Sequence, residues 1–113
     1  MDNENITIEE VIEICSKARI CDGTLCFDAY GTSDIRGKTL IFLYERNISL
    51  DEAEHIINTL TRNELTDGPV DNYLADRIHK IWIFLKKYKG MKLYIKLLIY
   101  GKRRKVAVIS LHD

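Results

Sequence analysis

The sequence predicts an α+β fold in which N-terminal helices pack on a C-terminal antiparallel sheet. Apolar residues recur at helical spacing in several segments of residues 7–60, and the pattern changes to alternation from Ile78 onward. Close turns at Lys89-Gly90 and at residues 101–104 separate the alternating segments. Because short turns connect only antiparallel strands, these segments should form a meander.

The first predicted helix begins at Thr7, since Thr7 and Glu10 have the spacing of a capping box. Its apolar side is formed by Ile8, Val11, Ile12 and Cys15. This helix should end near Ala18, before the Cys21-Asp22-Gly23 turn. The stretch 24–30 is a candidate short strand.

Two further helices are expected before the sheet. Residues 36–46 show helical spacing, and Asn47 is a suitable residue to end that helix. Ser49 and Glu52 form a second capping box, which begins a helix with Ala53, Ile56, Ile57 and Leu60 on its apolar side. Asp67-Gly68-Pro69 is predicted to be a turn.

Strands are expected near residues 79–86, 92–100 and 105–111. Side chains two apart in a strand share a face. The face toward the helices should carry Ile81, Ile83, Leu93, Ile95, Leu97 and Ile99. The other face should carry Lys80, Trp82, Phe84, Lys86, Tyr94, Lys96 and Tyr100. Ser110 and His112 join this second face if Ile109 and Leu111 point to the core.

The length and composition indicate one domain covering residues 1–113. No apolar run approaches the roughly 20 residues that span a bilayer, and the acidic start is unlike a signal peptide. A cytoplasmic protein without membrane association is therefore expected. Cys15, Cys21 and Cys26 match no zinc spacing, so they are interpreted as small buried or half-buried thiols, and no metal or cofactor is predicted.

The charge is unevenly distributed although the total is zero. Residues 1–76 hold 6 basic and 16 acidic side chains, a balance of −10, whereas residues 77–113 hold 11 basic and 1 acidic, a balance of +10. Such asymmetry favours a polyanionic partner for the basic half. The alternative is that acidic helices pack beside basic strands and offset their charge.

The mixture of cations and aromatic rings on the second face is the composition that RNA binding requires. Lysine and arginine neutralise phosphates, and rings stack on unpaired bases. The candidate RNA-binding residues are Arg77, Lys80, Trp82, Phe84 and Lys86. The alternative is an ordinary solvated face, with Trp82 and Phe84 buried under a loop.

Cleavage of RNA needs a base for the 2′-OH, an acid for the leaving 5′-oxygen and a cation for the phosphorane. His112 can serve as acid or base, Tyr94 is the second proton-transfer candidate, and Lys96 can hold the phosphate. An isolated histidine is more often inert. No Asp/Glu cluster occurs in the C-terminal half, so the expected mechanism is metal-independent.

Several motifs in this order resemble the MqsR family of toxins. The matching segments are 81–84 (IWIF), Gly90, 93–97 (LYIKL) and 108–112 (VISLH), preceded by Arg36 and Lys38, 47–49 (NIS) and the LT…GPVD pattern of 60–71. The resemblance covers roughly residues 8–112.

This resemblance implies a RelE-like fold and metal-independent endoribonuclease activity on mRNA, with a cognate antitoxin protein as partner. It places the family's active-site tyrosine on Tyr94, the following lysine on Lys96 and the C-terminal basic position on His112. The chain departs from the family pattern at Asp67, Ile83 and Leu111, where the family has a lysine, a polar residue and a phenylalanine. Two other functions stay open: a non-catalytic RNA- or protein-binding module, and a structural partner that docks an acidic protein.

Overall fold

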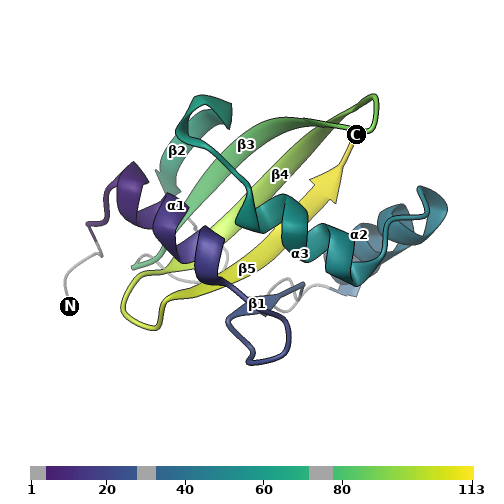
Figure 1. Ribbon diagram of the computed structural model, residues 1–113. Helices are drawn as coiled ribbons and strands as arrows, with labels where there is room; N and C mark the ends of the chain where they lie inside the picture. The colour runs from purple at the N-terminus through teal and green to yellow at the C-terminus, as the bar shows by residue number, and fades with distance from the viewer. Residues whose placement is uncertain (1–4, 28–32, 72–77) are drawn as a thin grey trace.

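The computed structural model describes residues 5–27, 33–71 and 78–113, which form three α-helices, one 3₁₀ helix and a five-stranded sheet (Figure 1). The helices are α1 (Ile8–Lys17), α2 (Ser33–Glu45), α3 (Leu50–Asn58) and the 3₁₀ helix η1 (Arg62–Glu64). The strands are β1 (Leu25–Cys26), β2 (Leu65–Asp71), β3 (Lys80–Tyr88), β4 (Met91–Tyr100) and β5 (Lys105–His112). Within these ranges, no helix has the length and apolar character needed to cross a membrane.

Both predicted capping boxes are confirmed. The main-chain N–H of Glu10 donates to the Thr7 hydroxyl at 3.2 Å, and that of Glu52 donates to the Ser49 hydroxyl at 3.0 Å. These bonds satisfy main-chain groups that have no partner within the helix, so α1 and α3 begin where their sequences predict. Asn47 adopts a left-handed conformation with φ of 56° just after α2, as expected of a residue that ends a helix.

The sheet has the strand order β1-β5-β4-β3-β2. Strands β3, β4 and β5 form the predicted antiparallel meander. Strand β1 pairs in parallel with β5, so the sheet is mixed rather than purely antiparallel. It also lies between α1 and α2 in the chain, so the helices do not all precede the strands as predicted. Of the candidate strand at 24–30, only residues 25–26 form a strand, and residues 28–30 lie outside the described ranges.

The prediction of a turn at Asp67-Gly68-Pro69 is wrong, because these residues lie within β2. Strand β2 is at the edge of the sheet, where a proline can sit without removing a ladder hydrogen bond. Its pairing with β3 shifts register twice, which accommodates the irregular backbone. Gly68 is needed there: its φ is +132°, and a Cβ would lie 3.1 Å from the Cα of Trp82.

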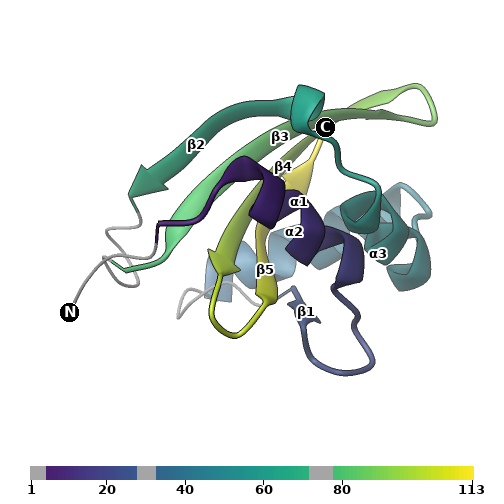
Figure 2. The ribbon, with the colours of Figure 1, turned by 60° about the vertical axis from the view of Figure 1, so that its left-hand side comes forward.

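The main core lies between the sheet and the helices α1 and α3, which cover one face of it (Figures 1 and 2). This face, called the helix face below, carries the predicted residues of β4, namely Leu93, Ile95, Leu97 and Ile99. They are buried together with Val11, Ile56 and Ile57, while Ile12 packs at the margin. The prediction for β4 is therefore confirmed.

The prediction for β3 has the two faces inverted. Trp82 lies opposite Leu97 and Phe84 opposite Ile95, and directly opposed residues of an antiparallel pair share a face. Both rings are consequently in the main core, at 3% and 0% exposure. Ile81 and Ile83 point to the opposite face, where they join a second cluster with Leu98. The rings offer more apolar area than isoleucine, which explains why they occupy the larger core.

A β-bulge in β5 determines where its last residues point. Leu97 pairs with Val108 but Lys96 pairs with Ser110, so Ile109 is an extra residue in the ladder. The bulge lets Val108 and Leu111 both reach the main core. Ile109 packs instead against the second cluster. The sequence analysis expected both Ile109 and Leu111 to point to the core, and this holds only for Leu111. Ser110 and His112 then lie on the opposite face.

Candidate functional site

Tyr94, Lys96 and His112 lie together on the opposite face of the sheet. In the pairing of β4 with β5, Tyr94 is directly opposite His112 and Lys96 is opposite Ser110. The Tyr94 and His112 rings are stacked, with centroids 5.0 Å apart and planes 22° apart. All three side chains line a pocket of about 410 Å³. The structure therefore brings together the three residues that the sequence analysis proposed for catalysis.

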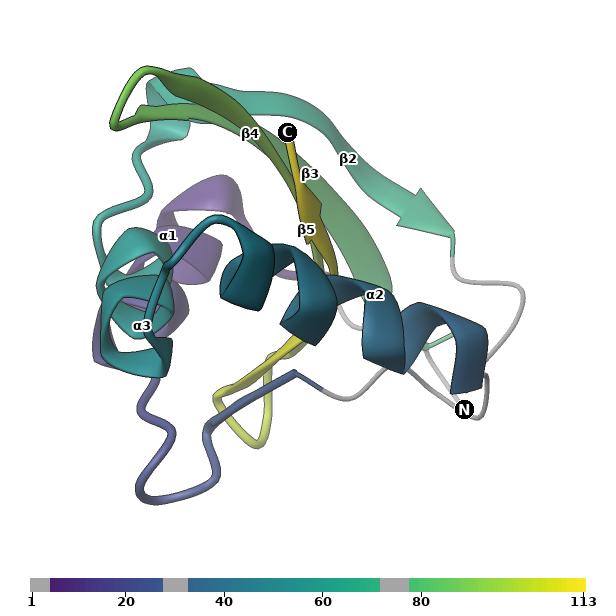
Figure 3. The same ribbon diagram turned by 90° about the vertical axis from the view of Figure 1, so that its right-hand side faces the viewer.

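Helix α2 supplies another side of this pocket. Lys38 and Thr39 line it along with the strand residues. The helix runs beside β5, across the edge of the sheet (Figure 3). Phe42 and Leu43, one turn further along, are buried in the main core and hold α2 in place. Lys38 entered the sequence analysis only through the family resemblance, because strand parity cannot report a lysine that a helix contributes.

The orientation of the His112 ring is fixed by its neighbour. Nδ1 of His112 lies 3.1 Å from the main-chain oxygen of Asp113, and an oxygen of that kind only accepts hydrogen bonds. Nδ1 therefore donates, which leaves Nε2 of the neutral ring as a proton acceptor. The Asp113 carboxylate accepts in turn from Arg46, with Oδ2 2.8 Å from Nη2 and 3.2 Å from Nε. Arg46 thus ties the end of β5 to the end of α2.

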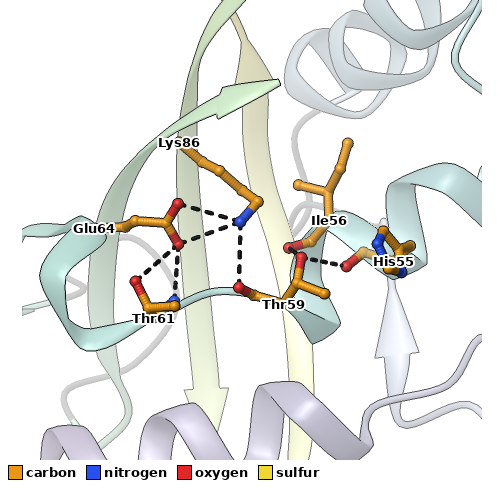
Figure 4. A network of polar contacts seen from close by, with 6 residues as sticks. All are labelled: His55, Ile56, Thr59, Thr61, Glu64 and Lys86. Atoms are coloured by element: carbon orange, nitrogen blue, oxygen red, sulfur yellow. Dashed lines mark hydrogen bonds and ion pairs between the residues drawn. The ribbon is translucent and has the colours of Figure 1, made fainter. Parts of the chain in front are cut away.

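Three of the predicted RNA-binding residues do not lie on the sheet face that carries the pocket. Trp82 and Phe84 are core residues, so the prediction that they stack on bases is wrong for the reason given above. Lys86 shares their parity and points to the helix face, with only 13% of its side chain exposed. Its ammonium group lies 3.2 Å from both Glu64 Oε2 and the Thr59 carbonyl oxygen (Figure 4). This lysine joins β3 to the segment that follows α3.

Of the other two predicted RNA-binding residues, the structure describes only Lys80. Lys80 is opposite Ile99, far along β4 from Tyr94, and it forms an ion pair with Asp71. Because Ile99 lies on the helix face, the prediction that Lys80 shares a face with Lys96 is wrong. Arg77 lies outside the described residues.

Two lysines that the sequence analysis did not select lie on the same face as Tyr94. Lys87 and Lys92 are directly opposite each other in the β3–β4 pair, and both are exposed. Lys87 was missed because β3 was assigned the inverted parity, whereas Lys92 has the parity predicted for β4 and was not selected. We call Lys87, Lys92, Tyr94, Lys96, Ser110 and His112 the basic surface.

The cysteines and acidic residues offer no second catalytic centre within the described ranges. Cys15 is buried, and burial raises the pKa of its thiol to about 12, so it stays protonated. Cys26 is half-buried, whereas Cys21 is exposed and departs from the expectation of buried thiols. No group of three or more His, Cys, Asp or Glu side chains in the described residues is arranged to hold a metal ion.

A scan against protein-family models and a search of curated proteins both find no match for this chain. The resemblance to MqsR-family toxins therefore rests on the short sequence motifs alone. The RelE-like fold, the toxin activity and the antitoxin partner stay predictions, and the function has to be argued from the chemistry of the site.

Proposed function

We propose that this protein binds single-stranded RNA and cleaves it in a metal-independent reaction, as the toxin of a toxin–antitoxin pair. The observation that carries the proposal is the convergence of Tyr94, Lys96 and His112 on one pocket of a lysine-rich surface. Proton transfer and cation stabilisation are the two requirements of RNA cleavage, and these residues offer both. The RelE-like fold and a cytoplasmic site of action belong to the same proposal.

The roles follow from the geometry. Nε2 of His112 accepts the proton of the 2′-OH, whose oxygen attacks the adjacent phosphorus. Tyr94 donates its phenolic proton to the 5′-oxygen as the P–O bond breaks, leaving a 2′,3′-cyclic phosphate and a free 5′-OH. Lys96, with Lys38 across the pocket, balances the charge of the phosphorane. Protein cations do here what a metal ion does in other nucleases.

A non-catalytic RNA-binding module is the second candidate. The observation that favours it is the extension of the basic surface to Lys87 and Lys92, because these residues lie beyond the pocket and offer only charge. In that case RNA binding would persist without cleavage. The resemblance to MqsR-family toxins favours the catalytic alternative, since it places that family's active-site residues on Tyr94, Lys96 and His112.

Growth after induction in a bacterial host tests the proposal in cells. We expect growth arrest by the wild type and relief of arrest by His112→Ala and by Tyr94→Phe. The matched controls are His55→Ala and Tyr44→Phe, which change exposed residues outside the pocket and should arrest growth like the wild type. Equal arrest by all five proteins would remove His112 and Tyr94 from the toxic activity.

A further inference from the structure

Lys87 and Lys92 form a pair of like charges without a carboxylate partner in the part of the chain that the structure describes. They face each other across the β3–β4 ladder, where side chains of opposed residues have Cβ atoms about 5 Å apart. Like charges in that position destabilise a sheet. Within the described residues, no carboxylate forms an ion pair with either lysine. An external anion bound between the two ammonium groups would replace this repulsion by attraction.

Two neighbouring lysines on the same hairpin, Lys86 and Lys89, do form ion pairs with carboxylates. Lys86 pairs with Glu64 at 3.2 Å, and Lys89 pairs with Glu52 at 2.7 Å. Both acids come from the helical part of the chain, on the other side of the sheet. Strands β3, β4 and β5 themselves contain no acidic residue. The charge of Lys87 and Lys92 is therefore left for solvent or a ligand.

We propose that Lys87 and Lys92 hold a second phosphate of the RNA strand whose scissile phosphate lies at Lys96. This inference rests on the proposed function. Lys92 and Lys96 share a strand face four residues apart, which is about 13 Å at 3.3 Å per residue. Roughly two to four nucleotides cover that distance, because phosphates of one stacked strand advance about 3.4 Å and those of an extended strand advance more.

An unpaired oligonucleotide that spans both phosphate sites should accordingly be a better substrate than a dinucleotide, which reaches only the site at Lys96. Tyr94 lies between the two lysine positions, half-buried and stacked on His112. An aromatic ring between two phosphate sites suits a base that is splayed out of a helix. An acidic protein segment would use the same charges but would gain nothing from the ring.

Binding of a single-stranded 2′-O-methyl octanucleotide, which cannot be cleaved, tests this subsite. We expect the double variant K87Q/K92Q to bind about ten-fold more weakly than wild type at low salt. The slope of log affinity against log salt should fall by about 0.7, the contribution of one phosphate on a single strand. The matched control is K102Q/R103Q, which removes the same charge from the exposed turn after β4 and should retain wild-type affinity and slope.

Other outcomes separate the subsite from the catalytic proposal. Cleavage of a dinucleotide by K87Q/K92Q should equal that of wild type, whereas cleavage of the RNA octamer should show a raised KM. If wild type binds the octamer through these lysines but cleaves no RNA, the catalytic proposal fails and the subsite stands. Equal binding by wild type and K87Q/K92Q overturns the subsite. Binding of polyglutamate instead of the octamer also overturns it, in favour of a protein ligand.

Discussion

At the scale of single residues, burial and charge pairing distinguish the structural side chains from the candidate functional ones. Lys86 and Lys96 are both lysines on central strands, but Lys86 is held by Glu64 whereas Lys96 lines the pocket without an ion pair to a described residue. Trp82 and Phe84, which the composition made attractive for base stacking, are enclosed by the main core. Whether a lysine or an aromatic ring on these strands is available to a ligand therefore depends on the face to which it points more than on its residue type.

Truncation of Ile95, one of the fully buried residues of β4, should be costly. This side chain is fully buried between Phe84 and Leu111 on the neighbouring strands, so Ile95→Ala leaves a cavity and should lower the free energy of unfolding by about 2–5 kcal/mol. Chemical denaturation measures this loss. Ile41→Ala is the control, because that side chain is exposed and its truncation should change stability little. A stable Ile95→Ala protein would mean that β4 presents its other face to the helices.

Glu52 should make the protein sensitive to acid. Hydrogen bonds from Lys89 and from Tyr88 lower the pKa of its carboxyl from 4.5 to about 2. Because the folded pKa is depressed, the stabilisation is complete above about 4.5 and is lost as the pH falls toward 2. Thermal melting between these two pH values should show a smaller acid-induced drop for Glu52→Gln than for wild type. An identical pH dependence would show that the contact does not persist in solution.

At the scale of elements, the helices and central strands could be predicted, but side-chain directions in two strands could not. The capping boxes at Thr7 and Ser49 identify helix starts because those residues act locally. Strand β3 is apolar at both parities, so alternation alone does not say which set meets the helices. The bulge at Ile109 depends on pairing with β4, a contact across the sheet that leaves no local sequence signal.

The sequence also predicted part of the candidate site. Tyr94 and Lys96 lie on one face because strand parity requires it, and His112 joins them only because the bulge shifts the end of β5. Strand parity did not predict Lys38 or Lys87 at this face, since Lys38 depends on the position of α2 and Lys87 on the true parity of β3. Edge strand β2 was missed because its Gly-Pro sequence has the composition of a turn.

The link between α2 and β5 should position His112 for proton transfer. Arg46 binds the Asp113 carboxylate, and the main-chain oxygen of Asp113 accepts from the His112 ring. In Arg46→Gln this link is lost, so kcat for RNA cleavage should fall while KM stays near the wild-type value. Arg46→Lys should restore kcat. Arg62→Gln, which breaks a comparable exposed pair with Glu9, is the control.

An unchanged kcat in Arg46→Gln would limit the Arg46–Asp113 pair to a structural role. Stability alone is not informative here, because exposed ion pairs contribute little to the free energy of unfolding.

At the scale of the whole molecule, the charge-offset interpretation is observed on the helix face of the sheet, and a polyanionic partner stays a prediction for the opposite face. On the helix face, acids from the N-terminal half pair with Lys86 and Lys89, as the charge-offset interpretation predicts. On the opposite face, Lys87, Lys92 and Lys96 have no ion pair within the described residues, which is the arrangement expected for a polyanionic ligand. A net charge of zero is therefore compatible with a lysine-rich surface on one face of the sheet.

The central claim is that His112 and Tyr94 cleave RNA without a metal. Its most direct test is incubation of the purified protein with a defined single-stranded RNA in excess EDTA, followed by analysis of the product ends. We predict cleavage that leaves a 2′,3′-cyclic phosphate, with rates lower by about 10²–10⁴-fold for His112→Ala and Tyr94→Phe. His55→Ala should cleave at the wild-type rate. Loss of wild-type cleavage in EDTA, or equal rates for all these variants, would contradict the account.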